Sequence, residues 1–348
     1  MAIMVTGGAG YIGSHAVQRL LADGHRVVCV DNLFRGHREA MEILSRGAGA
    51  RLVFVAAEVG DRDLMLRLIE SHGVDTVMHF AALAYVGESV NMPLRYYRAN
   101  AASMLGLLEA VEASHALPGG GVSRFVFSST CASYGEPVRE NIPIRETCPQ
   151  SPINPYGWSK LHGERMLMDF ADMCARAGRP FATARLRYFN VAGSDPAGLI
   201  GEHHEPETHV IPVALQAVLG QREAFTIFGT DYPTPDGTCI RDYVHVVDLV
   251  DAHVAVMNAI KPGEQRVYNL GIGSGFSVRQ VIDSVQRVTG AKLNIKEGPR
   301  RPGDPPELFA DPRKIREELN WQARHTDLDS IVQTAWRWFR EHPRGYAE

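Results

Sequence analysis

The amino-acid sequence predicts an α/β protein with a doubly wound parallel sheet, followed by a smaller C-terminal α/β domain. Three observations support this fold class. Short β-branched runs alternate with amphipathic stretches through the first half, and a glycine-rich turn links the first run to the first helical stretch. After about residue 190, Pro- and Gly-rich loops interrupt shorter elements. Alternation of this kind is typical of a parallel sheet with helices on both faces.

The individual elements follow from local composition. Runs typical of buried strands lie at 2–6, 26–31, 51–55, 75–80 and 124–129, and a further strand is expected within 178–190. Helical patterns separate them around 12–23, 62–71 and 94–114, and another helix begins near Tyr156. We therefore expect a first domain over 1–189 and a second over 190–348, whose loops can close over a ligand.

Composition excludes several classes of protein. Of the 348 residues, 45% are hydrophobic and 22% charged, as in an ordinary globular chain, and the net charge of −4 gives no support to binding of nucleic acid or anionic membranes. The five cysteines are odd in number and show no CxxC spacing, which argues for a reducing compartment. No apolar run is long enough to span a bilayer, and "MAIMVTGG" lacks the features of a signal peptide. We expect a cytoplasmic protein.

The segment "VTGGAGYIGSH" (5–15) indicates a dinucleotide site. Gly7, Gly10 and Gly13 lie between a predicted strand and a predicted helix, where glycines allow a tight turn and close approach of the backbone to a pyrophosphate. Asp31 ends the second predicted strand and is placed to accept hydrogen bonds from the adenosine ribose hydroxyls. Because its charge would repel a 2′-phosphate, the sequence favours NAD over NADP.

The segment "NPYGWSK" (154–160) predicts a reactive tyrosine. Tyr156 and Lys160 are four residues apart, so both side chains leave one face of the predicted helix, and the ammonium would lower the pKa of the phenol. Thr130 ends the preceding strand and would face the same crevice, where its hydroxyl can relay a substrate proton to Tyr156. Together these three residues predict oxidation of an alcohol to a ketone with NAD, and Lys160 would also bind the nicotinamide ribose.

Beyond these residues, the sequence resembles the UDP-glucose 4-epimerases, extended short-chain dehydrogenases of the Rossmann type, nearly from end to end. The segments that carry the resemblance are "GGAGYIGSH", "HFAALAYVGESV", "SSTCASYGEP", "PYGWSK", "LRYFNVAGSDP", "FGTDYPTPDGTCIRDYVHV" and "PRRPGD". The variants "STCASYG" and "PINPYG" are most similar to the branch that contains exopolysaccharide-linked and UDP-arabinose 4-epimerases.

The resemblance implies two sets of site residues. The residues expected around NAD are Gly7, Gly10, Tyr11, Ile12, Gly13, Asp31, Asn32, Glu58, Val59, Phe80, Ala81, Ala82, Tyr156, Lys160 and Phe189. The residues expected around a UDP-sugar are Thr130, Tyr156, Asn190, His209, Val210, Phe228, Arg241, Tyr243, Arg301, Asp304 and Leu308. Two arginines from different segments suit a diphosphate, because each guanidinium presents a planar fork of donors.

The sequence also departs from the family pattern. Ala84 stands where a lysine that contacts the cofactor is expected, and Ala99 replaces another polar contact. Glu58 replaces an aspartate that binds the adenine amino group, and His209 replaces an asparagine near the substrate. A glutamate can still accept the adenine hydrogen bond, whereas Ala84 weakens the expected hold on NAD.

The predicted activity is an NAD-dependent UDP-glucose/UDP-galactose 4-epimerase that works through a transient 4-keto sugar. Thr130 is followed by Cys131 and Ala132 rather than by the Asp–Glu pair that a sugar-nucleotide dehydratase would need to eliminate water. Alternative substrates are UDP-xylose/UDP-arabinose and UDP-N-acetylglucosamine. Alternative classes are a sugar-nucleotide 4-reductase or dehydrogenase that exchanges its cofactor, and a protein that binds dinucleotide without chemistry.

Three further expectations concern the oligomeric state, the range of substrates and the binding of a metal ion. A homodimer is implied by resemblance, with helices around 94–114 and 156–175 of each subunit forming a four-helix bundle. The apolar positions that fit such a bundle, most of which would also suit packing on the sheet, are Met104, Leu107, Leu108, Val111, Leu167 and Phe170. Leu308 stands where epimerases restricted to unacetylated sugars carry a tyrosine, so it predicts acceptance of UDP-N-acetylglucosamine. In "EHHEPETH" (202–209) we expect a polar loop beside the substrate and no metal, because there is no HExxH and Pro206 breaks any helix that could align ligands.

Overall fold

The computed structural model describes residues 2–301 and 304–346 of the chain. The chain forms two compact units. Unit 1 comprises Met1–Glu136, Cys148–Arg187 and Val250–Tyr268, and unit 2 comprises Pro137–Thr147, Tyr188–Leu249 and Asn269–Glu348. Neither unit is continuous in sequence, so the expected boundary between 189 and 190 is too simple. The chain returns to unit 1 after residue 249 because a later strand completes its sheet.

Unit 1 is built on a seven-stranded sheet with the order β11-β6-β5-β4-β1-β2-β3. The pairs from β3 to β5 run parallel, and every residue of β1 is buried. This arrangement confirms the predicted doubly wound parallel sheet. The strands are β1 Ala2–Thr6, β2 Arg26–Asp31, β3 Leu52–Ala56, β4 Val74–His79, β5 Arg124–Thr130, β6 Ala182–Tyr188 and β11 Gln265–Leu270.

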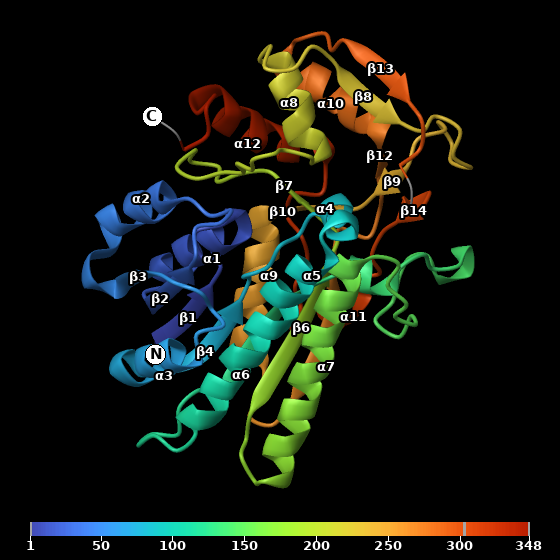
Figure 1. Cartoon of the computed structure of the whole chain (residues 1–348). Coiled ribbons are helices and arrows are strands. Elements are labelled where there is room, and N and C mark those ends of the chain that lie inside the picture. Colours follow the sequence, from blue (N-terminus) through green and yellow to red (C-terminus); the bar gives the residue numbers. More distant parts are fainter. Residues whose placement is uncertain (1, 302–303, 347–348) are drawn as a thin grey trace. The chain divides into compact units, whose positions relative to one another are not determined.

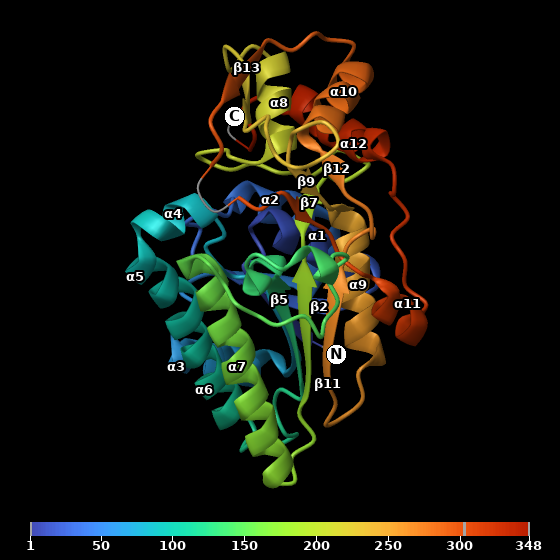
Figure 2. The same ribbon diagram turned by 90° about the vertical axis from the view of Figure 1, so that its right-hand side faces the viewer.

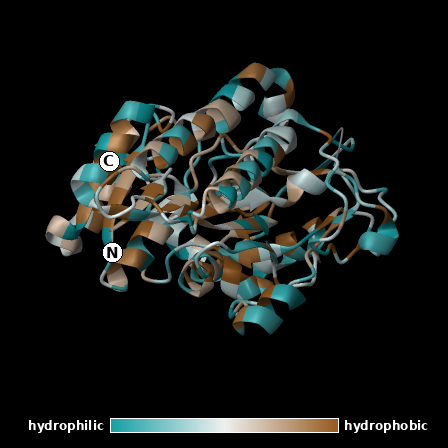
Figure 3. Cartoon of the chain, turned by 90° about the horizontal axis from the view of Figure 1, so that it is seen from below, coloured by the Kyte–Doolittle hydropathy of each residue, from teal (hydrophilic) through white to brown (hydrophobic). Residues whose placement is uncertain are grey.

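Helices cover both faces of this sheet. Helices α3, α6 and α7 lie on one face, and α1, α2 and α9 lie on the other (Figures 1 and 2). Both hydrophobic and hydrophilic residues line the long helices, as in amphipathic helices packed on a sheet (Figure 3). The helical elements are α1 Tyr11–Ala22, α2 Arg38–Ala48, η1 Gly49–Arg51, α3 Arg62–His72, α4 Val86–Asn91, α5 Pro93–Tyr96, η2 Tyr97–Ala102, α6 Ser103–Ser114, η3 Cys131–Tyr134, α7 Pro155–Arg176 and α9 Val246–Ala259.

The predicted elements of unit 1 are confirmed with small changes of boundary. Strands β1 and β2 begin and end where the sequence predicted. The stretch 94–114 is not one regular helix, because a π-helical segment, η2, separates α5 from α6. The strand expected within 178–190 begins only at Ala182, since the chain turns at Gly178 with φ of 69°. Strand β11, which lies at the edge of the sheet beside β6, was not predicted from the sequence.

Unit 2 consists of short strands and of helices α8, α10 and α12, which pack against one another (Figure 1). Its sheets are small: β10-β7, β12-β9-β14 and β13-β8. The elements are η4 Arg139–Asn141, β7 Asn190–Ala192, α8 Val210–Val218, β8 Phe225–Phe228, β9 Ile240–Arg241, β10 Tyr243–His245, β12 Phe276–Ser277, α10 Val278–Thr289, β13 Ile295–Gly298, β14 Glu307–Leu308, α11 Arg313–Leu319 and α12 Leu328–Glu341.

The apolar positions expected to form a dimer bundle lie instead inside unit 1. Met104, Leu107 and Val111 of α6 are fully buried in the core, as is Leu167 of α7. Leu108 is buried with them, and Phe170 packs against the same cluster. These side chains face the sheet because both helices must bury an apolar stripe on it. They are therefore not an open dimer face.

Within the described residues, no helix has the length and apolar character that crossing a membrane requires.

Candidate active site

The glycine-rich turn after β1 is closely packed. Gly7 has φ of 72°, and a Cβ built there would lie 2.5 Å from the backbone nitrogen of Ala81. A Cβ at Gly13 would lie 2.0 Å from the carbonyl oxygen of Gly7. Helix α1 follows directly, and its N-cap Gly10 has no capping side chain. A bare turn at a helix N-terminus is the arrangement that receives a pyrophosphate, so these residues fit a dinucleotide.

The acidic residue expected at the ribose is held by the backbone. Asp31, at the end of β2, accepts hydrogen bonds from the amides of Ala9 at 3.1 Å and Leu33 at 2.8 Å. Burial raises the pKa of Asp31, although those amide bonds act against the shift. Asn32 donates to Glu58 Oε1 at 3.1 Å. The structure thus brings the glycine turn, Asp31, Asn32 and Glu58 together at the carboxyl ends of β1, β2 and β3.

Thr130 and Tyr156 are carried by two elements in close contact. Thr130 ends β5, and its hydroxyl accepts the amide of Ala132 at 3.1 Å. Helix α7 begins at Pro155, after Asn154 caps it by accepting the amide of Gly157 at 2.9 Å. A Cβ at Gly157 would lie 2.5 Å from the carbonyl oxygen of Ala132. Only glycine lets the first turn of α7, which carries Tyr156, approach the segment after Thr130 so closely.

Lys160 lies one turn beyond Tyr156 and is almost completely buried, with 3% of its surface exposed. Its ammonium nitrogen lies 4.5 Å from the centre of the Phe127 ring. Burial lowers the pKa of Lys160 to about 7, although the Glu164 carboxylate acts in the opposite direction. Burial and the Lys160 charge together lower the pKa of His79 to about 3. The charge of Lys160 is therefore sensitive to its surroundings near neutral pH.

A buried ion pair that the sequence did not reveal joins α7, one helical turn beyond Lys160, to β6. Arg187 of β6 forms two bonds to Glu164, at 2.8 Å from Nε and 2.6 Å from Nη2. Ser129 donates to the same carboxylate at 2.5 Å, and Gln150 donates at 3.1 Å. Burial would raise the pKa of Glu164, but these donors hold it below its usual value. The spacing of Glu164 four residues after Lys160 was a signal, whereas nothing in the sequence marked Arg187.

A second buried group joins η2 to α7. The Asn100 side chain binds both backbone groups of Leu83, at 2.8 and 3.0 Å, and donates to Ser159 Oγ at 2.9 Å. The Tyr96 ring packs edge-on at 6.4 Å from the ring of Tyr156. The sequence indicated the loss of a polar residue at Ala99, but it gave no sign that the next residue, Asn100, is buried and hydrogen-bonded.

In unit 2 the structure groups most of the residues expected around a UDP-sugar into pairs. Arg241 forms a short ion pair with Asp304 and also donates to the carbonyl oxygens of Ile240 and Pro305, both at 2.7 Å. The Arg301 guanidinium lies 4.2 Å from the centre of the Phe228 ring. Leu308 pairs with Arg241 between β14 and β9, and Tyr243 pairs with Asn190 between β10 and β7. Phe189, expected at the cofactor, belongs to unit 2.

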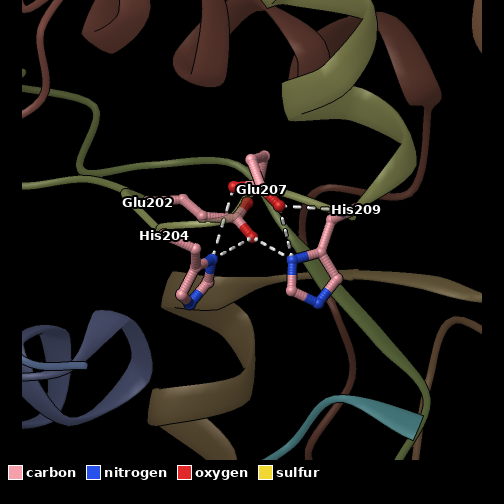
Figure 4. A group of neighbouring side chains, drawn as sticks. All are labelled: Glu202, His204, Glu207 and His209. Atoms are coloured by element: carbon pink, nitrogen blue, oxygen red, sulfur yellow. Dashed lines mark hydrogen bonds and ion pairs between the residues drawn. The ribbon is translucent and has the colours of Figure 1, made fainter. Parts of the chain in front are cut away.

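The loop 202–209 brings four potential ligands together at the start of α8 (Figure 4). Donor atoms of Glu202, His204, Glu207 and His209 all lie within 4.8 Å of one another. Burial opposes charge on His209, but hydrogen bonds to the two glutamates outweigh it and raise its pKa to about 10. The sequence predicted no metal ligands here because Pro206 breaks any helix that could align them. The four side chains nevertheless come together, because the irregular loop folds back on itself and brings them close without a helix.

Similar proteins agree with this architecture. The NAD dependent epimerase/dehydratase family matches residues 3–271. A probable UDP-arabinose 4-epimerase 3 of Oryza sativa subsp. japonica is 47% identical over 350 residues, covering 99% of this chain and 83% of the relative. A UDP-glucose 4-epimerase of Lacticaseibacillus casei is 44% identical over 349 residues, covering 100% and 99%.

Among solved structures, a UDP-glucose-4-epimerase from Stenotrophomonas maltophila with bound NAD and formylated UDP-arabinopyranose is similar. Its TM-score is 0.90 at 38% identity, and the match covers 99% of both chains. The match in sequence, the seven-stranded sheet and the glycine turn agree, and this chain belongs to the NAD dependent epimerase/dehydratase family.

Proposed function

We propose that this protein is an NAD-dependent UDP-sugar 4-epimerase that interconverts UDP-glucose and UDP-galactose. The observation that carries the proposal is the close approach of Gly157 in α7 to Ala132, two residues after Thr130, which brings the end of β5 to the helix of Tyr156 and Lys160. The segment after Thr130 offers Cys131 and Ala132, so no carboxylate follows it to eliminate water. A ketone formed at this site is therefore reduced again rather than dehydrated.

The cofactor would be held by the turn 7–13 and by the ends of β2, β3 and β4. Gly7, Gly10 and Gly13 would receive the pyrophosphate on their amides, while Asp31 would bind the adenosine ribose. Asn32, Glu58 and Val59 would surround the adenine, and Phe80, Ala81 and Ala82 would line the rest of the groove. When bound, NAD would supply the hydride acceptor and donor that oxidation and reduction at C4 require.

Tyr156 acts as the base. Thr130 hydrogen-bonds the 4-hydroxyl and relays its proton to the phenolate, and the same route returns the proton when the sugar is reduced. A charged Lys160 stabilises the phenolate, and Glu164 favours that charged form. Because the proton and the hydride both return, the net reaction is redox-neutral.

Residues of unit 2 would bind the nucleotide part of the substrate. Arg241 and Arg301 suit the diphosphate, and each is already oriented, by Asp304 and by the ring of Phe228 respectively. Asn190, His209, Val210 and Tyr243 complete the proposed set. A diphosphate held at fixed points allows the keto sugar to turn about its link and present its other face.

Two alternatives to the interconversion of UDP-glucose and UDP-galactose are also supported. The UDP-arabinose 4-epimerase relatives favour UDP-xylose and UDP-arabinose as alternative substrates, and a 4-reductase would use the same three catalytic residues. The purified protein should be assayed with a panel of UDP-sugars while its absorbance at the NADH band is followed. Epimerisation with bound NAD and no net NADH release is expected. Net release or consumption of NADH with turnover would instead establish a reductase or dehydrogenase.

We also propose that the enzyme is a cytoplasmic homodimer. Exposed apolar side chains on the stretches concerned include Leu94 of α5, Leu105 of α6 and Trp158 of α7, which are 81%, 49% and 41% exposed. None of the five cysteines forms a disulfide in the described chain, consistent with a reducing compartment. Sedimentation at micromolar concentration should give a dimer, and the Leu105→Glu and Trp158→Glu double variant should be monomeric. A wild-type monomer would contradict the proposal.

A further inference from the structure

Four side chains of loop 202–209 converge on one point in unit 2. Figure 4 shows His204 and His209 each directing a ring nitrogen toward the carboxylates of Glu202 and Glu207. His209 Nδ1 lies 3.0 Å from an oxygen of each glutamate, and His204 Nδ1 lies 3.4 Å from an oxygen of each. Both imidazoles thus face the same pair of carboxylates.

The separations of His204 match a coordination sphere better than hydrogen bonds, whereas those of His209 suit either. A charge-assisted N–H···O bond spans about 2.7–2.9 Å and one N–H points at one acceptor. His204 is equidistant from two carboxylates and outside that range for both. In tetrahedral zinc sites the Zn–N and Zn–O bonds are about 2.0–2.2 Å, which places neighbouring donor atoms roughly 3.3–3.5 Å apart. The two His204 separations of 3.4 Å equal those edges, and the two His209 separations of 3.0 Å are shorter; Glu207 offers Oε2 to His204 and Oε1 to His209.

The surrounding structure holds the carboxylates in place. The backbone oxygen of Glu202 accepts the indole N–H of Trp338 at 3.1 Å. Glu207 Oε1 accepts the amides of Thr208 at 2.7 Å and His209 at 2.8 Å. Glu202 and Glu207 are only 3% and 6% exposed, so two negative charges are buried side by side, and a protonated imidazole or a metal ion has to balance them. A pocket of about 450 Å³ is lined in part by Glu202, His204 and Glu207.

We propose that Glu202, His204, Glu207 and His209 form a binding site for a divalent transition metal ion, zinc in the first instance. Two imidazole nitrogens and two carboxylate oxygens suit tetrahedral Zn²⁺, whereas Ca²⁺ and Mg²⁺ prefer oxygen ligands alone. Two carboxylates neutralise the ion. Because His209 is the N-cap of α8, the ion fixes the loop to the start of that helix. This inference does not depend on the proposed epimerase activity.

The test uses the full-length chain, freed of metal with a chelator and exchanged into metal-free buffer. Zinc is titrated against a chromophoric competitor, and cobalt is added in a parallel sample. We expect one equivalent of zinc per chain and the strong visible absorption of four-coordinate cobalt. At free zinc about one hundred times the dissociation constant, the unfolding equilibrium constant should fall about a hundredfold.

Matched variants locate the site. His204→Gln and Glu207→Gln each remove one ligand and should weaken zinc binding roughly a hundredfold or more, while the cobalt spectrum loses its four-coordinate form. The controls are His203→Gln and Glu205→Gln, neighbours in the same loop whose side chains are outside the group. Both controls should bind zinc as the wild type does.

Three results would overturn the proposal: uptake by the wild type well below one equivalent, zinc binding that survives in both ligand variants, or equal losses in the controls. Circular dichroism reports whether each variant folds, and if one does not, uptake and the cobalt spectrum of the wild type decide. Zinc uptake is measured without a UDP-sugar. A protein that binds zinc but lacks epimerase activity would refute the proposed function and leave the metal site intact.

Discussion

The residues proposed to move the proton lie on long regular elements, whereas those proposed to hold the UDP-sugar lie on very short strands and loops. Thr130 ends a strand of 7 residues, and Tyr156 and Lys160 belong to a helix of 22 residues. Arg241, Tyr243 and Leu308 lie on strands of 2, 3 and 2 residues. Proton transfer requires fixed positions of the reacting groups, while recognition of a substrate can be adjusted by changes in loops.

The two regions also differ in how their charges are supported. Glu164 and Arg187 are 1% and 6% exposed in their side chains, and Ser129 and Gln150 supply further hydrogen bonds. In the Arg241–Asp304 pair the aspartate side chain is 27% exposed. A fully buried pair is difficult to replace, because either partner alone is a buried charge without compensation. The first pair should therefore matter for folding and the second mainly for binding.

The largest expected effect separates chemistry from binding. Tyr156→Phe should lower kcat by a factor of about 10²–10⁴, because the base is lost, while the amount of bound NAD stays as in the wild type. The matched change in unit 2, Tyr243→Phe, should act mainly on KM and leave kcat within roughly tenfold. Initial rates of UDP-glucose epimerisation measure both. A Tyr156→Phe variant that retains more than half of the wild-type kcat would refute the assignment.

The second prediction compares the ion pairs by stability. Glu164→Gln should reduce the free energy of unfolding by about 3–5 kcal/mol, since it leaves Arg187 buried without a counter-charge. Asp304→Asn should cost only about 1–2 kcal/mol, because Arg241 retains two carbonyl acceptors. Urea unfolding of the NAD-free proteins gives both values. Equal losses would show that burial does not distinguish the two regions.

The third prediction concerns pH. The pKa of Lys160 is about 7 in the folded chain and about 10.4 when unfolded, so the unfolded chain binds more protons between these values. Stability should therefore rise with pH from about 7 to 10, by up to about 1.4 kcal/mol per pH unit from this group alone. Lys160→Met should lack this contribution. The difference between the two proteins is measured by urea unfolding across that range, and a constant difference would show that Lys160 is not perturbed.

The smallest expected effect tests substrate breadth in unit 2. Leu308 is half-buried, and the amide of Asp242 donates to its carbonyl oxygen at 3.1 Å, so its backbone position is fixed. The wild type should epimerise UDP-N-acetylglucosamine as well as UDP-glucose. Leu308→Tyr should remove the first activity and largely spare the second, since overpacking costs about 1–3 kcal/mol. Wild-type protein inert toward UDP-N-acetylglucosamine, at concentrations that saturate with UDP-glucose, would instead mean that Leu308 only packs under its loop.

Much of the fold and of unit 1 followed from local patterns. The strands at 2–6 and 26–31 carry buried β-branched runs, and the glycine turn and Asp31 stand directly beside them in the sequence. The Tyr156–Lys160 spacing depends on one helical turn, and Asn154 and Pro155 mark where that helix begins. Each of these features is encoded by neighbours along the chain, which is why the sequence by itself determined them.

Other features depended on residues that are distant in sequence. Glu164 meets Arg187 across 23 residues, and β11 joins the sheet only after the chain has passed through most of unit 2. The core on the sheet buries the stripe of α6 that resembled a dimer face, and an irregular loop gathers four potential ligands around a proline expected to prevent it. Such pairings are selected by burial and by the need to satisfy buried charges. Neither leaves a local period in the sequence, so only the tertiary structure decided them.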